Sequence, residues 1–194
     1  MPRRIVIIQG HPDGTRQHLC DGLADAYEIS AMAAGHSVSR FDLGEIEFPL
    51  LHSEEEFETG AVPESLQAAV EAIAVADHIL LIFPLWLGTM PALVKAFLEQ
   101  VLKPGKAFAY RRSGFPKKLM KGKTARMVVT MGMPGLAYRW WFGAHGLIGI
   151  ERNILNFVGI YPVYTTLFGM ASTAGEWRRR RWIRLMKKYG RRGR

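Results

Sequence analysis

The sequence predicts an α/β fold in which a doubly wound, five-stranded parallel sheet carries helices on both of its faces. Apolar runs of strand length alternate about five times with segments of helical periodicity, and no internal repeat is detectable. Most of these runs lack an in–out alternation of apolar and polar residues, which is typical of parallel strands buried on both faces. The alternation of strand and helix favours a doubly wound sheet, and 194 residues suit a single domain.

Strands are expected at five places. Four are apolar runs rich in Ile, Leu and Val, and a shorter mixed run predicts a strand nearer the sheet edge. The apolar runs are residues 5–8, 79–83, 127–131 and 161–168, and the mixed run is 37–43.

Helices are expected between and after these strands, where apolar residues recur at helical spacing. Gly35 stands where a C-terminal cap belongs after the first helix, and Pro91 suits the first turn of the third. Pro104-Gly105 should end that third helix. The helical segments are residues 19–31, 65–76, 91–102, 148–157 and 177–189, whereas 52–63 and 111–123 have the composition of surface loops.

Composition restricts the kind of protein. The single cysteine, Cys20, excludes a disulfide framework and any multi-cysteine metal site, and it suits a reducing compartment. The apolar run near the N-terminus is too short for a signal peptide, and the apolar stretch 73–94 is interrupted by Asp77, His78 and two prolines. We therefore expect a cytoplasmic protein with no membrane span and no metal site.

The positive charge is concentrated at one end of the chain. Residues 176–194 hold ten basic residues and one acidic residue, which leaves sixteen of each sign in residues 1–175. The sequence thus predicts a neutral ligand-binding domain over 1–175 and a basic amphipathic helix and tail over 176–194. Because the domain itself is neutral, no nucleic-acid partner is expected.

The apolar stripe of this C-terminal helix comprises Trp182, Leu185, Met186 and Tyr189. We expect the helix to pack back on the domain, with contact to an acidic partner or an acidic membrane surface as the alternatives. The last residues, 191–194, are expected to be frayed.

A ligand site is expected at the carboxyl ends of the strands, where open α/β sheets bind their ligands. The loop over residues 9–18 has the composition of an anion site, since it leads into a helix N-terminus with unpaired N–H groups. Thr15 can donate a hydroxyl, and His11, Arg16 and His18 can add donors or charge. The loop lacks the glycine patterns of Rossmann and Walker sites, and the alternative is an ordinary strand–helix turn.

Two further loops follow the strands at 79–83 and 127–131. Residues 84–90 are apolar and aromatic, which suits contact with a flat ring; the alternative is that Trp86 and Leu87 cap the core. In the other loop, Gly132 would let the backbone approach a ligand closely. Tyr138 and His145 nearby are able to exchange protons, although each residue type is more often structural when taken alone.

The kind of chemistry follows from what these loops lack. No serine–histidine–acid set, metal cluster or carboxylate pair is present in the pattern. Hydride transfer on a bound flavin needs none of these, because the cofactor supplies the reactive atom.

Several motifs, in this order, resemble NAD(P)H:quinone oxidoreductases of the DT-diaphorase type. They begin with Gly-His-Pro-Asp at 10–13 and cover most of residues 4–160. The remaining motifs are residues 83–86, 90–95, 108–110, 130–134, 138–146 and 151–155.

The resemblance implies a flavodoxin-like fold, a homodimer, a bound FAD or FMN with a slight preference for FAD, and NAD(P)H as co-substrate. It implies two-electron reduction of a quinone-like acceptor through the flavin. The phosphate end of the flavin would lie on His11, Thr15, His18 and the backbone of Leu19, and Arg16 is added as a cofactor-binding candidate because it lies in the same loop. The ring would lie on Pro84, Leu85, Trp86 and Leu87, with Met131, Gly132 and Met133 at its polar edge. Tyr138 and His145 would occupy the places of the proton-relay pair of the family.

This sequence departs from the family pattern near the expected ring. Trp86 stands where some members have glutamine, and Gly88 stands where they have an aromatic residue. The spacing from Tyr138 to His145 is one residue longer than in the best-known animal members. Two alternative functions remain open: an ancillary regulatory subunit of a potassium-efflux transporter with the same fold, and an electron-carrier flavoprotein without a substrate pocket.

Overall fold

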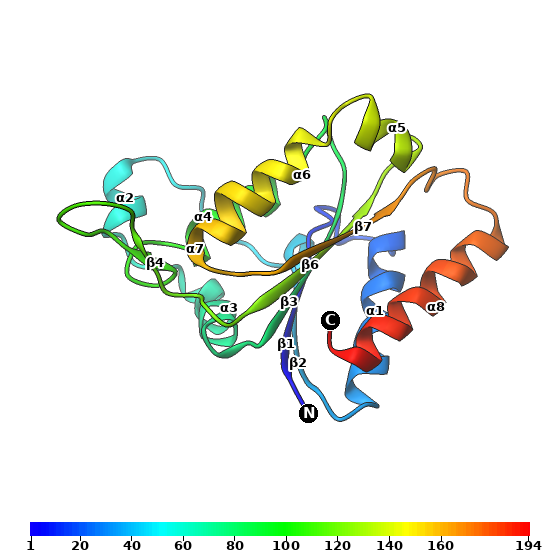
Figure 1. The fold of residues 1–194 in the computed structure, drawn as a ribbon, viewed down its shortest axis with the longest axis horizontal. Helices are drawn as coiled ribbons and strands as arrows, with labels where there is room; N and C mark the ends of the chain where they lie inside the picture. Colours follow the sequence, from blue (N-terminus) through cyan, green and yellow to red (C-terminus); the bar gives the residue numbers. More distant parts are fainter.

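Five parallel strands form the central sheet of the computed structural model, which describes residues 1–194 (Figure 1). Their order across the sheet is β2-β1-β3-β6-β7. The strands are β1 (Arg4–Gln9), β2 (Ser37–Asp42), β3 (His78–Pro84), β6 (Thr124–Thr130) and β7 (Val163–Phe168). This order is that of a flavodoxin-like sheet with its switch point between β1 and β3, so the predicted doubly wound architecture is confirmed.

Burial explains which strands the sequence pattern located best. The three inner strands are buried along nearly their whole length, and their continuous apolar runs follow from this. The two edge strands are only partly buried. The mixed run at 37–43 is one edge, as predicted. The other edge strand begins at Val163, two residues after the predicted start, because Tyr161 and Pro162 lie outside the ladder.

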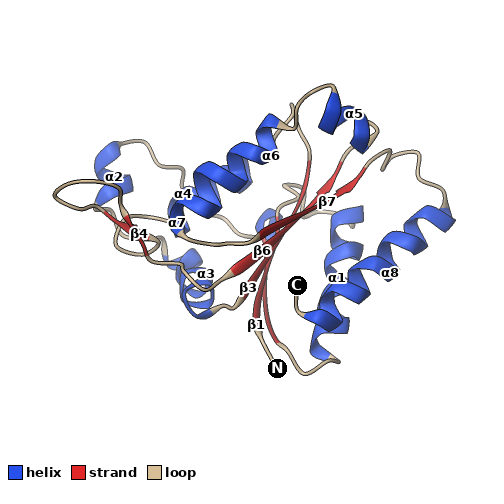
Figure 2. Cartoon of the chain, in the orientation of Figure 1, coloured by secondary structure: helices blue, strands red, loops and turns tan.

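Helices cover both faces of the sheet and make two separate cores (Figure 2). On one face lie α1 (Leu19–Met32) and α8 (Glu176–Arg192), packed against each other. The opposite face holds α3 (Glu64–Val75), α4 (Ala92–Val101) and a helical run after β6. That run comprises α5 (Gly135–Trp140), α6 (His145–Gly149), the π-helical segment η2 (Ile150–Leu155) and α7 (Asn156–Val158).

Two predicted loops contain short regular elements. Residues 52–63 include α2 (Glu54–Glu58), because the Ser53 hydroxyl accepts the N–H of Glu56 and three glutamates occupy the first turn. Residues 111–123 include β5 (Lys117–Lys118), which pairs with β4 (Phe108–Ala109). The remaining element, η1 (Leu43–Glu45), is a 3₁₀ turn that ends the predicted strand one residue early.

The C-terminal helix packs back on the domain, as expected. Trp182 and Met186 are buried in the core formed with α1. Gly190 lies so close to the Tyr27 carbonyl that an added Cβ would clash with it. The expected fraying of 191–194 is wrong: α8 continues to Arg192, and the Arg3 guanidinium donates to the Gly193 carbonyl at 3.1 Å. None of the helices combines the length and the apolar character that crossing a membrane requires.

Polar side chains lie buried between the sheet and these two helices. The Arg126 guanidinium lies 3.7 Å from the centre of the Tyr189 ring and donates to the Thr166 hydroxyl at 2.8 Å. His78 is fully buried, and its Nδ1 lies 2.7 Å from the Thr124 hydroxyl. Burial, together with the positive charges of Arg126 and Arg3, lowers the pKa of His78 to about 3.

This lowered pKa predicts a specific loss of stability in acid. The folded protein keeps His78 neutral down to about pH 3, whereas the unfolded chain takes up a proton below about pH 6.5. Stability therefore falls as pH decreases between these values, by about 2 kcal/mol between about pH 7 and about pH 5. His78→Asn, which keeps a neutral polar group beside Thr124, should remove this part of the pH dependence in urea unfolding. A matching change at exposed His52 should leave it, and equal pH dependence of wild type and His78→Asn would contradict the prediction.

Candidate functional site

The three predicted loops meet at the carboxyl edge of the sheet. The Gly10 N–H donates to the Ile82 carbonyl at 2.7 Å, and the Leu85 N–H donates to the Thr130 carbonyl at 2.8 Å. The His11 and Trp86 rings approach edge-on, with their centres 6.1 Å apart. Segments that are far apart in the sequence thus form one rim.

In the first loop, one carboxylate gathers the predicted anion-binding donors. Asp13 accepts the Thr15 N–H at 3.0 Å and the Thr15 hydroxyl at 2.6 Å. It also accepts Arg16 Nε at 3.1 Å and lies 2.9 Å from His18 Nε2. These contacts, those of Thr15 first, hold the pKa of the Asp13 carboxyl well below its usual range. The donors of the loop thus surround one carboxylate of the chain itself, that of Asp13.

His11 and Leu19 complete this loop. The His11 ring stacks on the His18 ring with the centres 3.5 Å apart. Burial, and secondarily the neighbouring His18, lower the pKa of His11, which favours a neutral ring. The main-chain N–H groups of Arg16, Gln17 and Leu19 donate to no protein acceptor. They offer unpaired donors at the N-terminus of α1.

Sequence reasoning missed the carboxylates and the amide that shape this loop. The buried Gln9 side chain accepts the His11 N–H and donates to Asp21 at 2.6 Å, and Asp21 in turn accepts the His18 N–H at 2.6 Å. The spacing of His18 and Asp21, three residues apart at a helix start, is the pattern of a capping box and was the available signal. Asp13 could have been found as the first residue of an Asx turn on Thr15.

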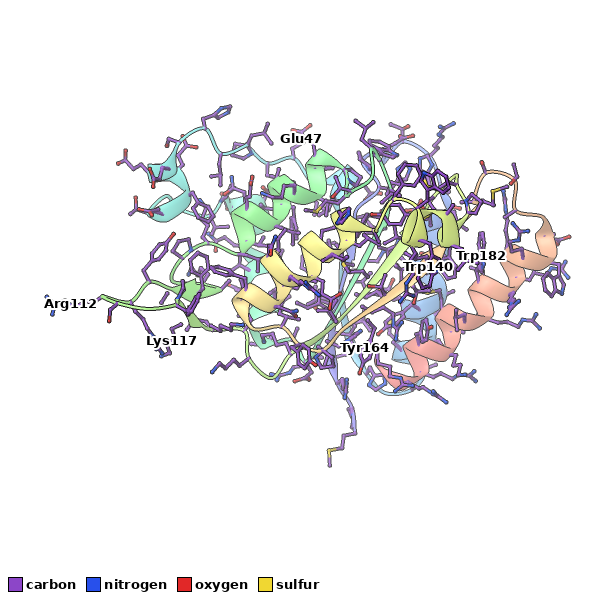
Figure 3. All side chains as sticks on the ribbon, turned by 45° about the horizontal axis from the view of Figure 1, so that its top comes forward. Glu47, Arg112, Lys117, Trp140, Tyr164 and Trp182 are labelled. Carbon is purple, nitrogen blue, oxygen red and sulfur yellow. The ribbon has the colours of Figure 1, made fainter.

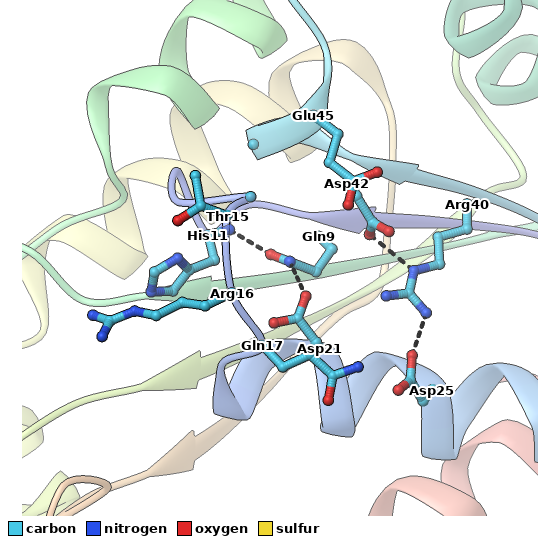
Figure 4. A pocket seen from close by; sticks show the side chains of 12 residues that line it. Gln9, His11, Thr15, Arg16, Gln17, Asp21, Asp25, Arg40, Asp42 and Glu45 are labelled. Atoms are coloured by element: carbon cyan, nitrogen blue, oxygen red, sulfur yellow. Dashed lines mark hydrogen bonds and ion pairs between the residues drawn. The ribbon is translucent and has the colours of Figure 1, made fainter.

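A polar cavity of about 280 Å³ adjoins the loop on the side of β2 (Figure 4). Its walls include four carboxylates, Asp21, Asp25, Asp42 and Glu45, and two guanidinium groups, Arg16 and Arg40. Arg40 contacts Asp25 at 2.5 Å, Asp42 at 2.8 Å and Glu28 at 3.0 Å. Burial alone would lower the pKa of Arg40, and the three carboxylates raise it instead. Acidic groups thus outnumber basic ones in the cavity beside the anion loop.

The second loop forms a tight two-residue turn. Trp86 and Thr89 exchange both main-chain hydrogen bonds at 3.0 Å, and Leu87 and Gly88 between them have positive φ. Positive φ at both central positions defines a type I′ turn, which Gly adopts freely and Leu does not. The Leu87 side chain is fully exposed and that of Trp86 is half exposed. Leu87 therefore does not cap the core, and the turn presents an apolar surface at the rim.

Two residues hold this turn from behind. The buried Tyr138 hydroxyl donates to the Gly88 carbonyl at 2.8 Å, and burial raises the pKa of Tyr138. Gly146 lies so close that an added Cβ would overlap the same carbonyl oxygen and Thr89. His145, by contrast, is exposed at the start of α6. The structure forms no hydrogen bond between Tyr138 and His145.

The third loop is fixed by the segment that follows β7. The Met131 carbonyl accepts the Ala171 N–H at 2.9 Å, and the Met133 carbonyl accepts the Met170 N–H at 3.0 Å. The N–H groups of Gly132 and Met133 donate to no protein acceptor. A Cβ on Gly132 would meet nothing within 4 Å. The loop therefore offers two free donors at an open position, while Pro84 and Leu85 lie behind it in and just after β3.

The rim thus brings three kinds of surface together at the carboxyl edge of the sheet. The first loop offers polar and charged donors, the second an apolar turn, and the third two free N–H groups. No group of three or more His, Cys, Asp or Glu side chains is placed to hold a metal ion.

Comparison with known proteins shows the family to which the chain belongs. A family model described as a flavodoxin-like fold matches residues 3–184, so the chain belongs to this family. An uncharacterized NAD(P)H oxidoreductase of Haemophilus influenzae is 33% identical over 172 residues, which cover 84% of this chain and 82% of that protein. An FMN-dependent NADH:quinone oxidoreductase of Jannaschia is 32% identical over 106 residues, covering 55% of this chain and 51% of that protein.

A solved structure shares the fold over the full length of both chains. The NAD(P)H:quinone oxidoreductase from Methanothermobacter marburgensis superposes with a TM-score of 0.82 at 21% identity, and 100% of each chain is covered. At this identity the likeness is one of fold.

The close packing of Gly146 on the Trp86–Thr89 turn predicts a sharp difference between two neighbouring glycines. Gly146→Ala should destabilise the protein by about 1–3 kcal/mol, since the added methyl group must displace the Gly88 carbonyl. Gly149→Ala, in the same helix with open space around it, should be neutral or stabilising by up to about 1 kcal/mol. Denaturant unfolding of both variants checks the pair, and equal effects would refute the packing of the turn.

Proposed function

We propose that the protein is a flavin-dependent NAD(P)H:quinone oxidoreductase. It transfers a hydride from NAD(P)H to a bound flavin and then two electrons to a quinone or similar small acceptor. The observation that carries the proposal is the convergence of the three loops, 10–19, 84–89 and 131–133, at one rim with unpaired N–H donors. The similarity to an NAD(P)H oxidoreductase, which covers 84% of this chain, supports the same activity. The similarities reported above give no support to a transporter subunit.

FMN is the proposed cofactor in place of FAD. A relative that covers about half of this chain is described as FMN-dependent. The electrostatics of the site point the same way, because Asp21, Asp25, Asp42 and Glu45 lie beside the anion loop. These carboxylates would repel the second phosphate group of FAD. The same relative is described as an NADH:quinone oxidoreductase, so we propose NADH as the electron donor. NADPH is the alternative donor to compare with it.

The residues of the rim fit such a cofactor. Thr15, Arg16 and His18 would turn from Asp13 to the phosphate group, aided by the Leu19 N–H and by the neutral His11 ring. When bound, the flavin supplies the site that accepts and donates the hydride.

The isoalloxazine ring would lie on the apolar segment after β3. Pro84, Leu85, Trp86 and Leu87 would contact its flat face, while the N–H groups of Gly132 and Met133 would meet its polar edge. Met131 is held by hydrogen bonds to Phe168 and Ala171, so it positions the two residues that follow it.

Tyr138 and His145 would have different roles in the proposed site. Exposed His145 is the group free to exchange a proton at the rim. The Tyr138 hydroxyl is occupied by the Gly88 carbonyl, so Tyr138 would act mainly by holding the turn under the ring.

A homodimer is the proposed assembly. Large apolar side chains are exposed around the rim on and just after α5, namely Leu136, Trp140, Trp141 and Phe142. An apolar groove of about 270 Å³ lies between α4, α7 and the β4 hairpin. Exposed apolar surface of this extent is typical of an interface. The cytoplasm is the proposed location, in keeping with the single buried thiol.

The activity has a direct test. Purified protein should be yellow, and heat-released cofactor should run as FMN in chromatography. Anaerobic NADH or NADPH should bleach the flavin band, and a soluble benzoquinone should restore it with a stoichiometry of two electrons. A colourless protein that takes up neither FMN nor FAD would overturn the proposal.

Arg16 provides a test of which part of the flavin the first loop holds. Arg16→Gln should weaken FMN binding by about tenfold, because it removes one cation from the phosphate position. Riboflavin, which lacks the phosphate, should bind wild type and variant equally. Fluorescence titration of both ligands makes the comparison, with Arg112→Gln as the control for loss of a distant charge. Equal weakening of both ligands would place Arg16 elsewhere in the site.

A further inference from the structure

The outward face of α8 is a continuous cationic surface. Nine basic side chains of the helix are exposed, and they are Arg178, Arg179, Arg180, Arg181, Arg184, Lys187, Lys188, Arg191 and Arg192. We propose that this face docks the protein on an anionic phospholipid membrane.

The charge of this face is not balanced within the molecule. Glu176, which pairs with Arg180, is the single acidic residue among residues 176–194. Residues 1–175, by contrast, hold sixteen basic and sixteen acidic residues, so that part of the chain is neutral as a whole. The counter-charge for α8 must therefore come from outside.

The shape of the face suits a flat surface. α8 lies along α1, and its inner side buries Trp182, Met186 and Gly190. The helix therefore lies along the domain with one long side exposed, which suits contact with an extended surface.

The composition of this face also favours lipid. Trp177 is 68% exposed on the outer side, and the Arg181 guanidinium lies 5.8 Å from the centre of its ring. Together with Ile183, Trp177 lines a shallow groove of about 550 Å³ among Arg179, Arg180, Arg184 and Lys187. Exposed Trp beside Arg and Lys is typical of helices that lie in the membrane–water interface.

Docking on a membrane would also indicate the class of electron acceptor. This step rests on the proposed function. Seven residues, 169–175, separate the end of β7 from the start of α8, which lies at the same edge of the sheet as the proposed flavin site. A quinone dissolved in the bilayer would then be the natural class of electron acceptor.

Vesicle binding tests the proposal without any measurement of turnover. The holoprotein is mixed with vesicles of phosphatidylcholine alone or with about 30% phosphatidylserine, and the bound fraction is measured by flotation. Because each Lys or Arg near an anionic surface adds to the attraction, we expect at least about tenfold tighter binding to the anionic vesicles. High salt should abolish the difference.

Two quadruple variants locate the binding face. The first carries Arg184→Gln, Lys187→Gln, Lys188→Gln and Arg191→Gln, all exposed and without side-chain hydrogen bonds. The control carries Arg111→Gln, Arg112→Gln, Lys117→Gln and Lys121→Gln, which removes the same charge; Figure 3 shows Arg112 and Lys117 at the end of the molecule away from α8. The first variant should lose at least about tenfold in vesicle affinity and the control less than about twofold.

Three outcomes would overturn the proposal: no binding of wild type to anionic vesicles, equal losses in the two variants, or tighter binding to a DNA duplex than to vesicles at equal phosphate concentration. Turnover with a soluble quinone should be the same in wild type and both variants. If wild type shows no turnover yet binds through α8, the proposed function fails while the docking surface stands.

Discussion

Strand β3 pairs with β1 on one side and with β6 on the other, and the whole site depends on this pairing. The register continues past the strands as single main-chain hydrogen bonds, Gly10 to Ile82 and Leu85 to Thr130. Each of these bonds joins the first residue of one loop to a neighbouring strand. Because parallel strands end at the same edge, three segments separated by more than forty residues begin side by side.

The close approach of these loops needs glycine at two points. An added Cβ on Gly10 would overlap the Val94 side chain of α4, and one on Gly146 would overlap the Gly88 carbonyl. The backbone of the rim is thus packed directly against the helices behind it. Such packing keeps the Trp86–Thr89 turn in place although the Leu87 backbone adopts a conformation that is costly for a side chain.

Charge is distributed unevenly over the molecule, with carboxylates around the cavity beside the first loop and basic side chains on the outer face of α8. Asp13 draws the donors of the first loop toward one point, which is where we propose that the phosphate group binds. The carboxylates around Arg40 then limit how much negative charge the neighbouring cavity accepts. The positive charge of the chain lies on the outer side of α8, away from this cavity, and it is free to act on a separate, extended anionic surface. Small-ligand binding and surface binding therefore do not compete for the same residues.

The sequence by itself determined the strands, the order of strand and helix, and the three loops at the carboxyl edge. Hydrophobic periodicity is a local property, and in a doubly wound fold it also fixes which residues fall at the carboxyl edge. It located Thr15, Arg16 and Trp86 at the rim for this reason. The pattern did not single out Gln9 and Asp21 as site residues. A single polar residue at a strand end or in a first helical turn is common in proteins and does not by itself indicate a site.

Only the tertiary structure decided how these side chains are used. The hydroxyl of Tyr138 turns to Gly88, a residue fifty positions earlier in the chain, and no spacing within the sequence encodes that contact. The same holds for the ordered end of α8, where Arg3 caps Gly193 and Arg126 lies against Tyr189. Such contacts join residues that are close only after the sheet and its helices have packed, so they depend on long-range geometry that local patterns do not record.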